Sequence, residues 1–160
     1  MRTVHACALV LTVDARQRGV LIEGPSGSGK TSLSAALLAG HRSDRLARLV
    51  ADDRVVLRVS HGRLISAPPA AIAGIAEVPF GGVVRVAHLG ACIVDAVVRL
   101  DATHPLRVPV PAHAGIAGEG GSVRLPLLRL APGRTAASAA AVRAWLRDGA
   151  LPLGHGAASP

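Results

Sequence analysis

Aromatic side chains are almost missing from this sequence. Its 160 residues include no tyrosine, no asparagine, one phenylalanine and one tryptophan. Proteins that bind single-stranded nucleic acid stack bases on aromatic rings, and this composition supplies no such surface. No apolar run approaches the ~18–20 residues that a membrane helix needs. Asp14 and Arg16 interrupt the apolar N-terminal stretch too early for a signal peptide. We therefore expect a cytoplasmic protein that binds neither membrane nor nucleic acid.

Cysteine is also scarce, with only Cys7 and Cys92 in the chain. Both lie in apolar stretches, so we interpret them as reduced core residues rather than as a disulfide or a pair of metal ligands. No cluster of cysteine and histidine has the spacing of a zinc site. The length suits one domain with a real core, and we predict a single folded domain over 1–147 and a disordered tail over 148–160.

The net charge of +8 comes almost entirely from arginine, since the chain has a single lysine. The arginines are spread along the sequence without a dense cluster, which indicates a coding bias rather than a basic patch. An acidic protein partner or bound phosphates would use the same charge. The one lysine, Lys30, therefore stands out as a position where arginine does not serve.

Lys30 belongs to a glycine-rich motif of the form G-x-x-x-x-G-K-T, between an apolar strand over 20–22 and a helical pattern over 31–38. This is the context of a P-loop, whose glycines let backbone N–H groups point at phosphate oxygens. A compact ammonium reaches the β- and γ-phosphates, and the hydroxyl of Thr31 binds Mg²⁺. The motif predicts a site for ATP and Mg²⁺. Its residues are Gly24, Pro25, Ser26, Gly27, Ser28, Gly29, Lys30 and Thr31.

The rest of the chain favours strands over helices. We predict a long surface loop over 103–121, and the stretch 70–76 fits a short helical turn without a firm assignment. The many strands, joined by short hairpins, do not follow a regular βαβ alternation. The predicted fold class is therefore α/β, a P-loop domain with a mixed, hairpin-rich β-sheet. The predicted strands are 4–13, 20–22, 46–51, 55–59, 63–65, 83–86, 92–100 and 123–130, with a turn at 14–19 and helices over 31–38 and 136–146.

Three acidic residues are candidates for a metal ligand or a catalytic base near the phosphates. Asp52 and Asp53 end the strand after the P-loop helix, where a right-handed crossover brings them beside the loop. Neighbouring side chains in a strand point to opposite faces, but this rule relaxes at a strand end, so both or only one can reach the site. Either aspartate could instead cap a turn. Glu77 precedes Gly81 and Gly82, where the backbone can approach a ligand closely.

These residues together resemble the catalytic domain of HPr kinase/phosphorylase, in the short form that lacks an extra N-terminal domain. The resemblance covers about 4–146, and its most specific part is the Val-Ala-Asp-Asp-Arg-Val stretch after a P-loop. It is carried by His5, the P-loop 24–31, the stretch 49–55, Glu77, and the segments 98–101 and 132–134.

The resemblance implies an ATP-dependent kinase that phosphorylates a serine of HPr, a small phosphocarrier protein of the phosphotransferase system. It also implies the reverse phosphorolysis, a fold similar to that of phosphoenolpyruvate carboxykinase, and a hexamer. Asp52 would be the acid/base, and His5 would support the proton movement or orient phosphate. Thr31, Asp53 and Glu77 would hold Mg²⁺.

One segment departs from the family pattern, which reads Glu-x-Arg-Gly-x-Gly. Over 77–82 this chain reads Glu-Val-Pro-Phe-Gly-Gly, so Pro79 replaces the arginine and Phe80 the first glycine. Proline donates no hydrogen bond. We therefore expect phosphorolysis to be weaker than the kinase reaction, or lost, and leave open whether Arg107 or Arg134 compensates.

Two other functions stay open at this point. The chain could be a catalytically degenerate regulator that binds nucleotide without transferring phosphate, which the altered segment after Glu77 favours. The intact Lys30, Thr31, Asp52 and Asp53 oppose this alternative. The chain could also be an unrelated P-loop kinase for a small molecule, although it has no arginine-rich lid helix.

Overall fold

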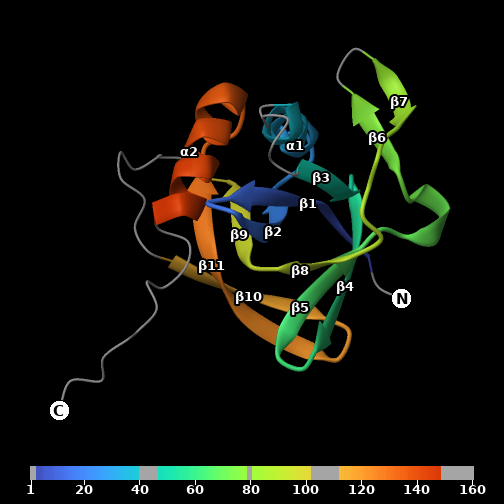
Figure 1. The fold of residues 1–160 in the computed structure, drawn as a ribbon, viewed down its shortest axis with the longest axis vertical. Helices are drawn as coiled ribbons and strands as arrows, with labels where there is room; N and C mark the ends of the chain where they lie inside the picture. The colour runs from blue at the N-terminus through green and yellow to red at the C-terminus, as the bar shows by residue number, and fades with distance from the viewer. Residues whose placement is uncertain (1–2, 40–46, 79–80, 102–111, 149–160) are drawn as a thin grey trace.

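In the part of the chain that the structure describes, one large curled sheet carries two α-helices on one of its faces (Figure 1). The computed structural model describes residues 3–39, 47–78, 81–101 and 112–148. Within them, the main sheet has nine strands in the order β10-β11-β9-β2-β1-β4-β5-β8, with β3 paired to β1. Strands β6 and β7 form a separate two-stranded sheet that projects at the upper right of Figure 1. The α/β fold class with a mixed sheet is confirmed.

The elements follow the chain as a run of strands interrupted by helices. The strands are β1 (Thr3–Val13), β2 (Arg16–Glu23), β3 (Ala47–Ala51), β4 (Arg54–Ser60), β5 (Arg63–Ala67), β6 (Ile75–Val78), β7 (Gly82–Arg85), β8 (Cys92–Val94), β9 (Ala96–Leu100), β10 (Ala112–Gly118) and β11 (Gly121–Leu130). The helices are α1 (Lys30–Ala39), α2 (Thr135–Asp148) and the short 3₁₀ helix η1 (Ala70–Ile72). None of the helices in the described ranges is long and apolar enough to cross a membrane.

Strand β1 is apolar on both sides because both of its faces are covered. Cys7 and Leu9 face the helices, whereas Ala6 and Ala8 face the inside of the curl. A two-residue turn at Asp14 and Ala15, with φ of 47° and 61°, joins β1 to β2. The turn is shorter than the predicted 14–19, since residues 16–19 already pair with β1.

Asp95 divides the predicted strand 92–100 into β8 and β9. Its carboxylate accepts a hydrogen bond from Gly19 N at 2.9 Å, and its own N–H donates to Gly19 O at 2.8 Å. A Cβ at position 19 would overlap the carbonyl oxygen of Ile93, so only glycine permits this approach. The chain therefore changes partners here, from β5 before Asp95 to β2 and β11 after it.

Strand β10 occupies most of the described part of the segment 103–121, so the prediction of a surface loop was wrong there. It pairs with β11 from Ala112 to Gly118, and the sheet then curls until Glu119 reaches β4. Glu119 N donates to Leu57 O at 2.9 Å, and Val59 N donates to Glu119 O at 2.7 Å. Residues 102–111 lie outside the described ranges.

Helix α2 packs beside α1 on the outer face of the sheet. Leu33 and Leu37 of α1 share an apolar core with Val142 and Leu146 of α2. Arg143 Nη2 donates to the carbonyls of Ala36 and Leu37, at 3.2 and 3.0 Å, in the last turn of α1. These two bonds tie α2 to the C-terminal end of α1. Of the predicted tail 148–160, Asp148 is the last residue of α2 and the rest lies outside the described ranges.

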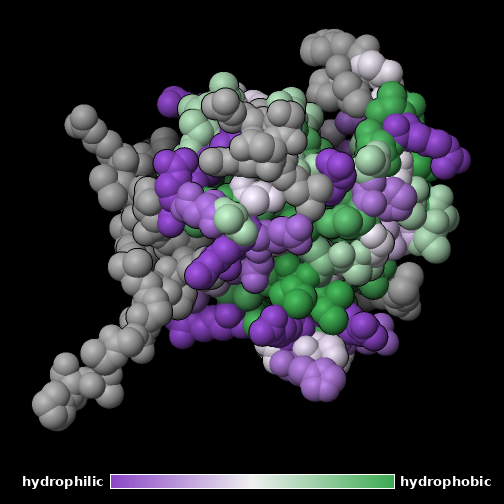
Figure 2. Space-filling model, in the orientation of Figure 1, coloured by the Kyte–Doolittle hydropathy of each residue, from purple (hydrophilic) through white to green (hydrophobic). Residues whose placement is uncertain are grey.

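Polar side chains cover much of the face seen in Figure 2, with apolar residues exposed along the β6–β7 hairpin at its upper right. Among the described residues, the large apolar side chains that are exposed are Val83 on β7 and Ile93 on β8. The candidate functional residues lie elsewhere, around the loop that connects β2 to α1.

Candidate active site

A glycine-rich loop over 24–29 connects the end of β2 to the start of α1. Gly27 and Gly29 have φ of 76° and 95°, a region that favours glycine. A Cβ built on either glycine would have no heavy atom within 4 Å, so the loop leaves open space on that side. Leu33 N donates to Gly29 O at 2.9 Å, which begins the helical ladder directly at the loop. This shape fits a phosphate group at a helix N-terminus.

Lys30 is 5% exposed and folds back over the loop that precedes it. Its Nζ donates to Gly24 O and to Pro25 O, both at 2.9 Å. An ammonium has three protons, so one remains for a ligand. Ser28 Oγ is buried and has no hydrogen-bond partner among the described residues. An unsatisfied buried hydroxyl is costly, and a bound phosphate oxygen would satisfy it.

Asp52 lies at the centre of a hydrogen-bond cluster against the loop. Its Oδ1 accepts from Thr31 Oγ1 at 3.2 Å and from Cys7 Sγ at 2.9 Å. Its Oδ2 accepts from the backbone N–H of Glu77 at 3.0 Å. The residue is 8% exposed. A carboxylate offers about four acceptor positions, and three of them are taken here.

Asp53 turns away from this cluster and pairs with His5 instead. Its φ is 64°, and this reversal separates its side chain from that of Asp52. His5 Nδ1 lies 2.8 Å from Asp53 Oδ1, and the two side chains are 48% and 60% exposed. Of the two adjacent aspartates, the structure therefore brings Asp52 to Thr31 and leaves Asp53 beside His5.

Glu77 meets the cluster through its backbone. Its side chain is exposed and, within the described residues, makes no hydrogen bond or ion pair. Its role as a metal ligand stays a prediction. The described residues also contain no group of three or more His, Cys, Asp or Glu side chains that could hold a metal. A P-loop Mg²⁺ needs few protein ligands, because phosphates and water supply the rest, so the oxygens of Thr31 and Asp52 fit it.

Cys7 is the site residue that sequence reasoning missed, because it reads as an apolar position of a core strand. Burial chiefly, and then the charge and hydrogen bond of Asp52, raise the pKa of the Cys7 thiol well above its ordinary value. The thiol therefore stays protonated and donates to the carboxylate. One signal could have found it: Cys7 lies two residues after His5 in a strand, and such residues share a face.

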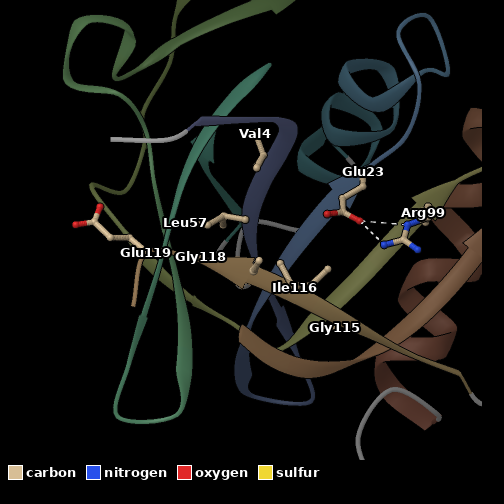
Figure 3. Close-up of a pocket in the computed structure, with 9 residues that line it drawn as sticks. Val4, Glu23, Leu57, Arg99, Gly115, Ile116, Gly118 and Glu119 are labelled. Carbon is tan, nitrogen blue, oxygen red and sulfur yellow. Dashed lines mark hydrogen bonds and ion pairs between the residues drawn. The ribbon is translucent and has the colours of Figure 1, made fainter. Parts of the chain in front are cut away.

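A cavity of about 540 Å³ opens on the other face of the sheet, inside the curl (Figure 3). Val4, Leu57 and Ile116 form apolar walls. On another side, Arg99 Nη2 and Nε donate to Glu23 Oε2 at 2.7 and 3.2 Å. Glu23 directly precedes the glycine-rich loop, so this ion pair holds β2 to β9 where the loop begins.

Comparison with known proteins finds a likeness in structure alone. No protein-family model matches the sequence, and no curated protein matches it. A solved structure described as the HPr(Ser) kinase/phosphatase from Coxiella burnetii aligns with a TM-score of 0.69 and 24% sequence identity. The alignment covers 90% of this chain and 95% of that chain. This protein therefore shares the fold of an HPr(Ser) kinase/phosphatase.

Proposed function

We propose that the protein is an ATP-dependent serine kinase acting on an HPr-like phosphocarrier protein of the phosphotransferase system. The observation that carries this proposal is the contact of Thr31, in the Lys-Thr pair of a P-loop motif, with a buried aspartate, Asp52. P-loop enzymes that transfer phosphoryl groups use such a pair at the metal. The shared fold with a protein named for action on HPr supports the choice of substrate over a small molecule.

The glycine-rich loop would bind the triphosphate. Its backbone N–H groups, the Lys30 ammonium and the Ser28 hydroxyl are the donors available to phosphate oxygens. Thr31 Oγ1 and Asp52 would hold Mg²⁺, which neutralises charge on the phosphates when bound. Phosphoryl transfer asks little more of a protein than positioning and charge stabilisation, and these groups supply both.

The two aspartates would have different roles, one as proton acceptor and the other as metal ligand. The resemblance gives Asp52 the acid/base role and Asp53 a metal role, but the contacts favour the reverse assignment. Asp52 is nearly buried and has three of its acceptor positions occupied. Asp53 is exposed, so a serine on a protein substrate can reach it. We place the proton acceptor at Asp53, oriented by His5, and the metal at Asp52.

The kinase direction is the one we propose as dominant. Pro79 and Phe80, which replace the arginine and glycine of the family pattern, lie outside the described residues, so the effect on phosphorolysis stays a prediction. The same replacement favours the second candidate function, a regulator that binds nucleotide without turnover. A hexamer, implied by the resemblance, and a cytoplasmic location, where HPr would be met, are also proposals.

A labelling experiment separates these functions. The protein is incubated with γ-labelled ATP, Mg²⁺ and HPr, and the labelled residue is located by mass spectrometry. Label on a serine of HPr supports the kinase. Nucleotide binding without label supports the regulator, and no binding of any purine nucleotide with Mg²⁺ refutes both.

Two isosteric variants test the assignment of the aspartates. Asp53→Asn should keep nucleotide affinity within about 2-fold and lower transfer by about 10²–10⁴-fold, the usual contribution of a general base. Asp52→Asn should raise the Mg²⁺ concentration needed for nucleotide binding. Asp14→Asn, in the exposed β1–β2 turn, is the matched control and should change neither. If Asp52→Asn abolishes transfer without changing Mg²⁺ dependence, the assignment implied by the resemblance is the right one.

A further inference from the structure

The thiol of Cys7 makes a contact that a core residue does not need. Its side chain is fully buried in β1, on the face that packs against the helices. The other β1 residues in this core cluster, Leu9, Leu11 and Val13, contribute apolar surface alone. Cys7 differs because its Sγ lies 2.9 Å from Asp52 Oδ1 and donates a hydrogen bond to it. An apolar residue of the same size would pack equally well and leave that oxygen with one donor fewer.

The three donors around Asp52 come from three different elements. Cys7 belongs to β1, Thr31 to α1, and the Glu77 amide to β6. The Cys7 and Thr31 donors share Oδ1, while the amide contacts Oδ2. Of these donors, Thr31 is the one that would also bind Mg²⁺. The side chain that holds Asp52 from the sheet is therefore Cys7.

We infer that Cys7 is a positioning residue, whose S–H fixes the rotation of the Asp52 carboxylate so that it meets Thr31 and the metal between them. The inference rests on the proposed binding of Mg²⁺ and nucleotide but not on the identity of the substrate. Outer-shell partners of metal ligands typically change metal affinity by about 10–100-fold when they are removed.

Three substitutions at this position separate donation from packing. Cys7→Val removes the donor and slightly enlarges the side chain, Cys7→Ala removes the donor and makes the side chain smaller, and Cys7→Ser keeps a donor. The measurement is the Mg²⁺ concentration that gives half-maximal binding of a fluorescent ATP analogue. We expect Cys7→Val and Cys7→Ala to need about 10-fold more Mg²⁺, and Cys7→Ser to stay within about 3-fold of the parent protein. Circular dichroism and thermal melting establish that each variant is folded.

The other thiol provides the control. Cys92→Val removes a cysteine that contacts Ser66, away from the cluster, and should leave the Mg²⁺ dependence unchanged. If Cys7→Val and Cys7→Ala bind with the Mg²⁺ dependence of the parent, Cys7 serves packing alone and the inference is wrong. If Cys7→Ser does not fold, the comparison of Cys7→Val with the parent decides. Failure to phosphorylate HPr, with these Mg²⁺ shifts intact, would overturn the proposed substrate but not the role of Cys7.

Discussion

The residues of the candidate site differ in how well their positions could be predicted from the sequence. The loop 24–31 could be predicted in full, because its glycines and Lys30 form a contiguous motif with one geometry. The different directions of the Asp52 and Asp53 side chains could not be predicted. They depend on a φ of 64° at Asp53, which the neighbouring residues in the sequence do not indicate. Cys7 was interpreted as core and is core. Its contact with Asp52 joins residues 45 positions apart, so the sequence gives only an indirect sign of it, the strand face that Cys7 shares with His5.

The residue scale also offers a test at alkaline pH. Burial chiefly raises the pKa of the Cys92 thiol above its ordinary value of 9.0, nearby Asp95 raises it further, and the Ser66 contact opposes the shift. Because the folded state holds this proton more tightly than the unfolded state, the stabilisation is complete below pH 9 and declines as the pH rises above it. With no tyrosine and one lysine in the chain, the main other contributor to this decline is Cys7, whose thiol pKa burial also raises.

We therefore expect the free energy of unfolding to fall between pH 8 and pH 10, and to fall less in Cys92→Ala. Urea unfolding followed by the fluorescence of the single tryptophan, Trp145, measures both. Parallel declines in the two proteins would show that Cys92 contributes nothing to the pH dependence.

Elements with a continuous apolar run or an apolar helical stripe were predicted well. Elements that depend on pairing with distant strands were predicted poorly. Strand β1 and helix α2 lie within a few residues of their predicted bounds. The strand β10 is rich in alanine and glycine, has low intrinsic β-propensity, and forms because β11 pairs along its whole length. The break between β8 and β9 arises from the bonds of Asp95 to Gly19, a residue 76 positions away.

The contact between the two helices gives a prediction at this scale. Arg143→Met removes the Nη2 group and both of its hydrogen bonds to carbonyls in the last turn of α1, so we expect unfolding to become easier by about 1–2 kcal/mol. The loss is limited because Arg143 Nε is buried without a partner in the described residues, and methionine removes that cost as well. Chemical denaturation measures the change. Arg147→Met, on an exposed position of α2, is the matched control and should stay within about 0.5 kcal/mol of the parent.

At the scale of the whole molecule, the main sheet curls until the end of β10 meets β4, and the sequence did not predict this closure. The predicted class, a hairpin-rich mixed sheet with a helix after the glycine-rich loop, is what the structure has. The closure depends on the bonds of Glu119 to Leu57 and Val59, between strands far apart in the chain. Such pairings follow from the twist of the complete sheet rather than from any one strand.

Two glycines of β10 test the closure. A Cβ at Gly118 would lie 3.0 Å from the backbone of Leu57, in a ladder that cannot easily yield, whereas one at Gly115 meets nothing within 4 Å. We expect Gly118→Ala to cost about 1–3 kcal/mol of stability, as overpacking does, and Gly115→Ala to be neutral or slightly stabilising. Thermal unfolding of the pair measures the difference. Equal melting temperatures would mean that β10 and β4 separate without cost.

The hairpin β6–β7 stands apart from the main sheet, yet the amide of Glu77 joins it to the carboxylate at the nucleotide site. The amide proton of Glu77 therefore links the hairpin to the Asp52 carboxylate. Any event that rotates Asp52, whether a metal, a nucleotide or a substitution at Cys7, must lengthen or release that bond. In an isotope-labelled sample, a single backbone resonance would then report on the site from outside it, through its chemical shift and its rate of exchange with water.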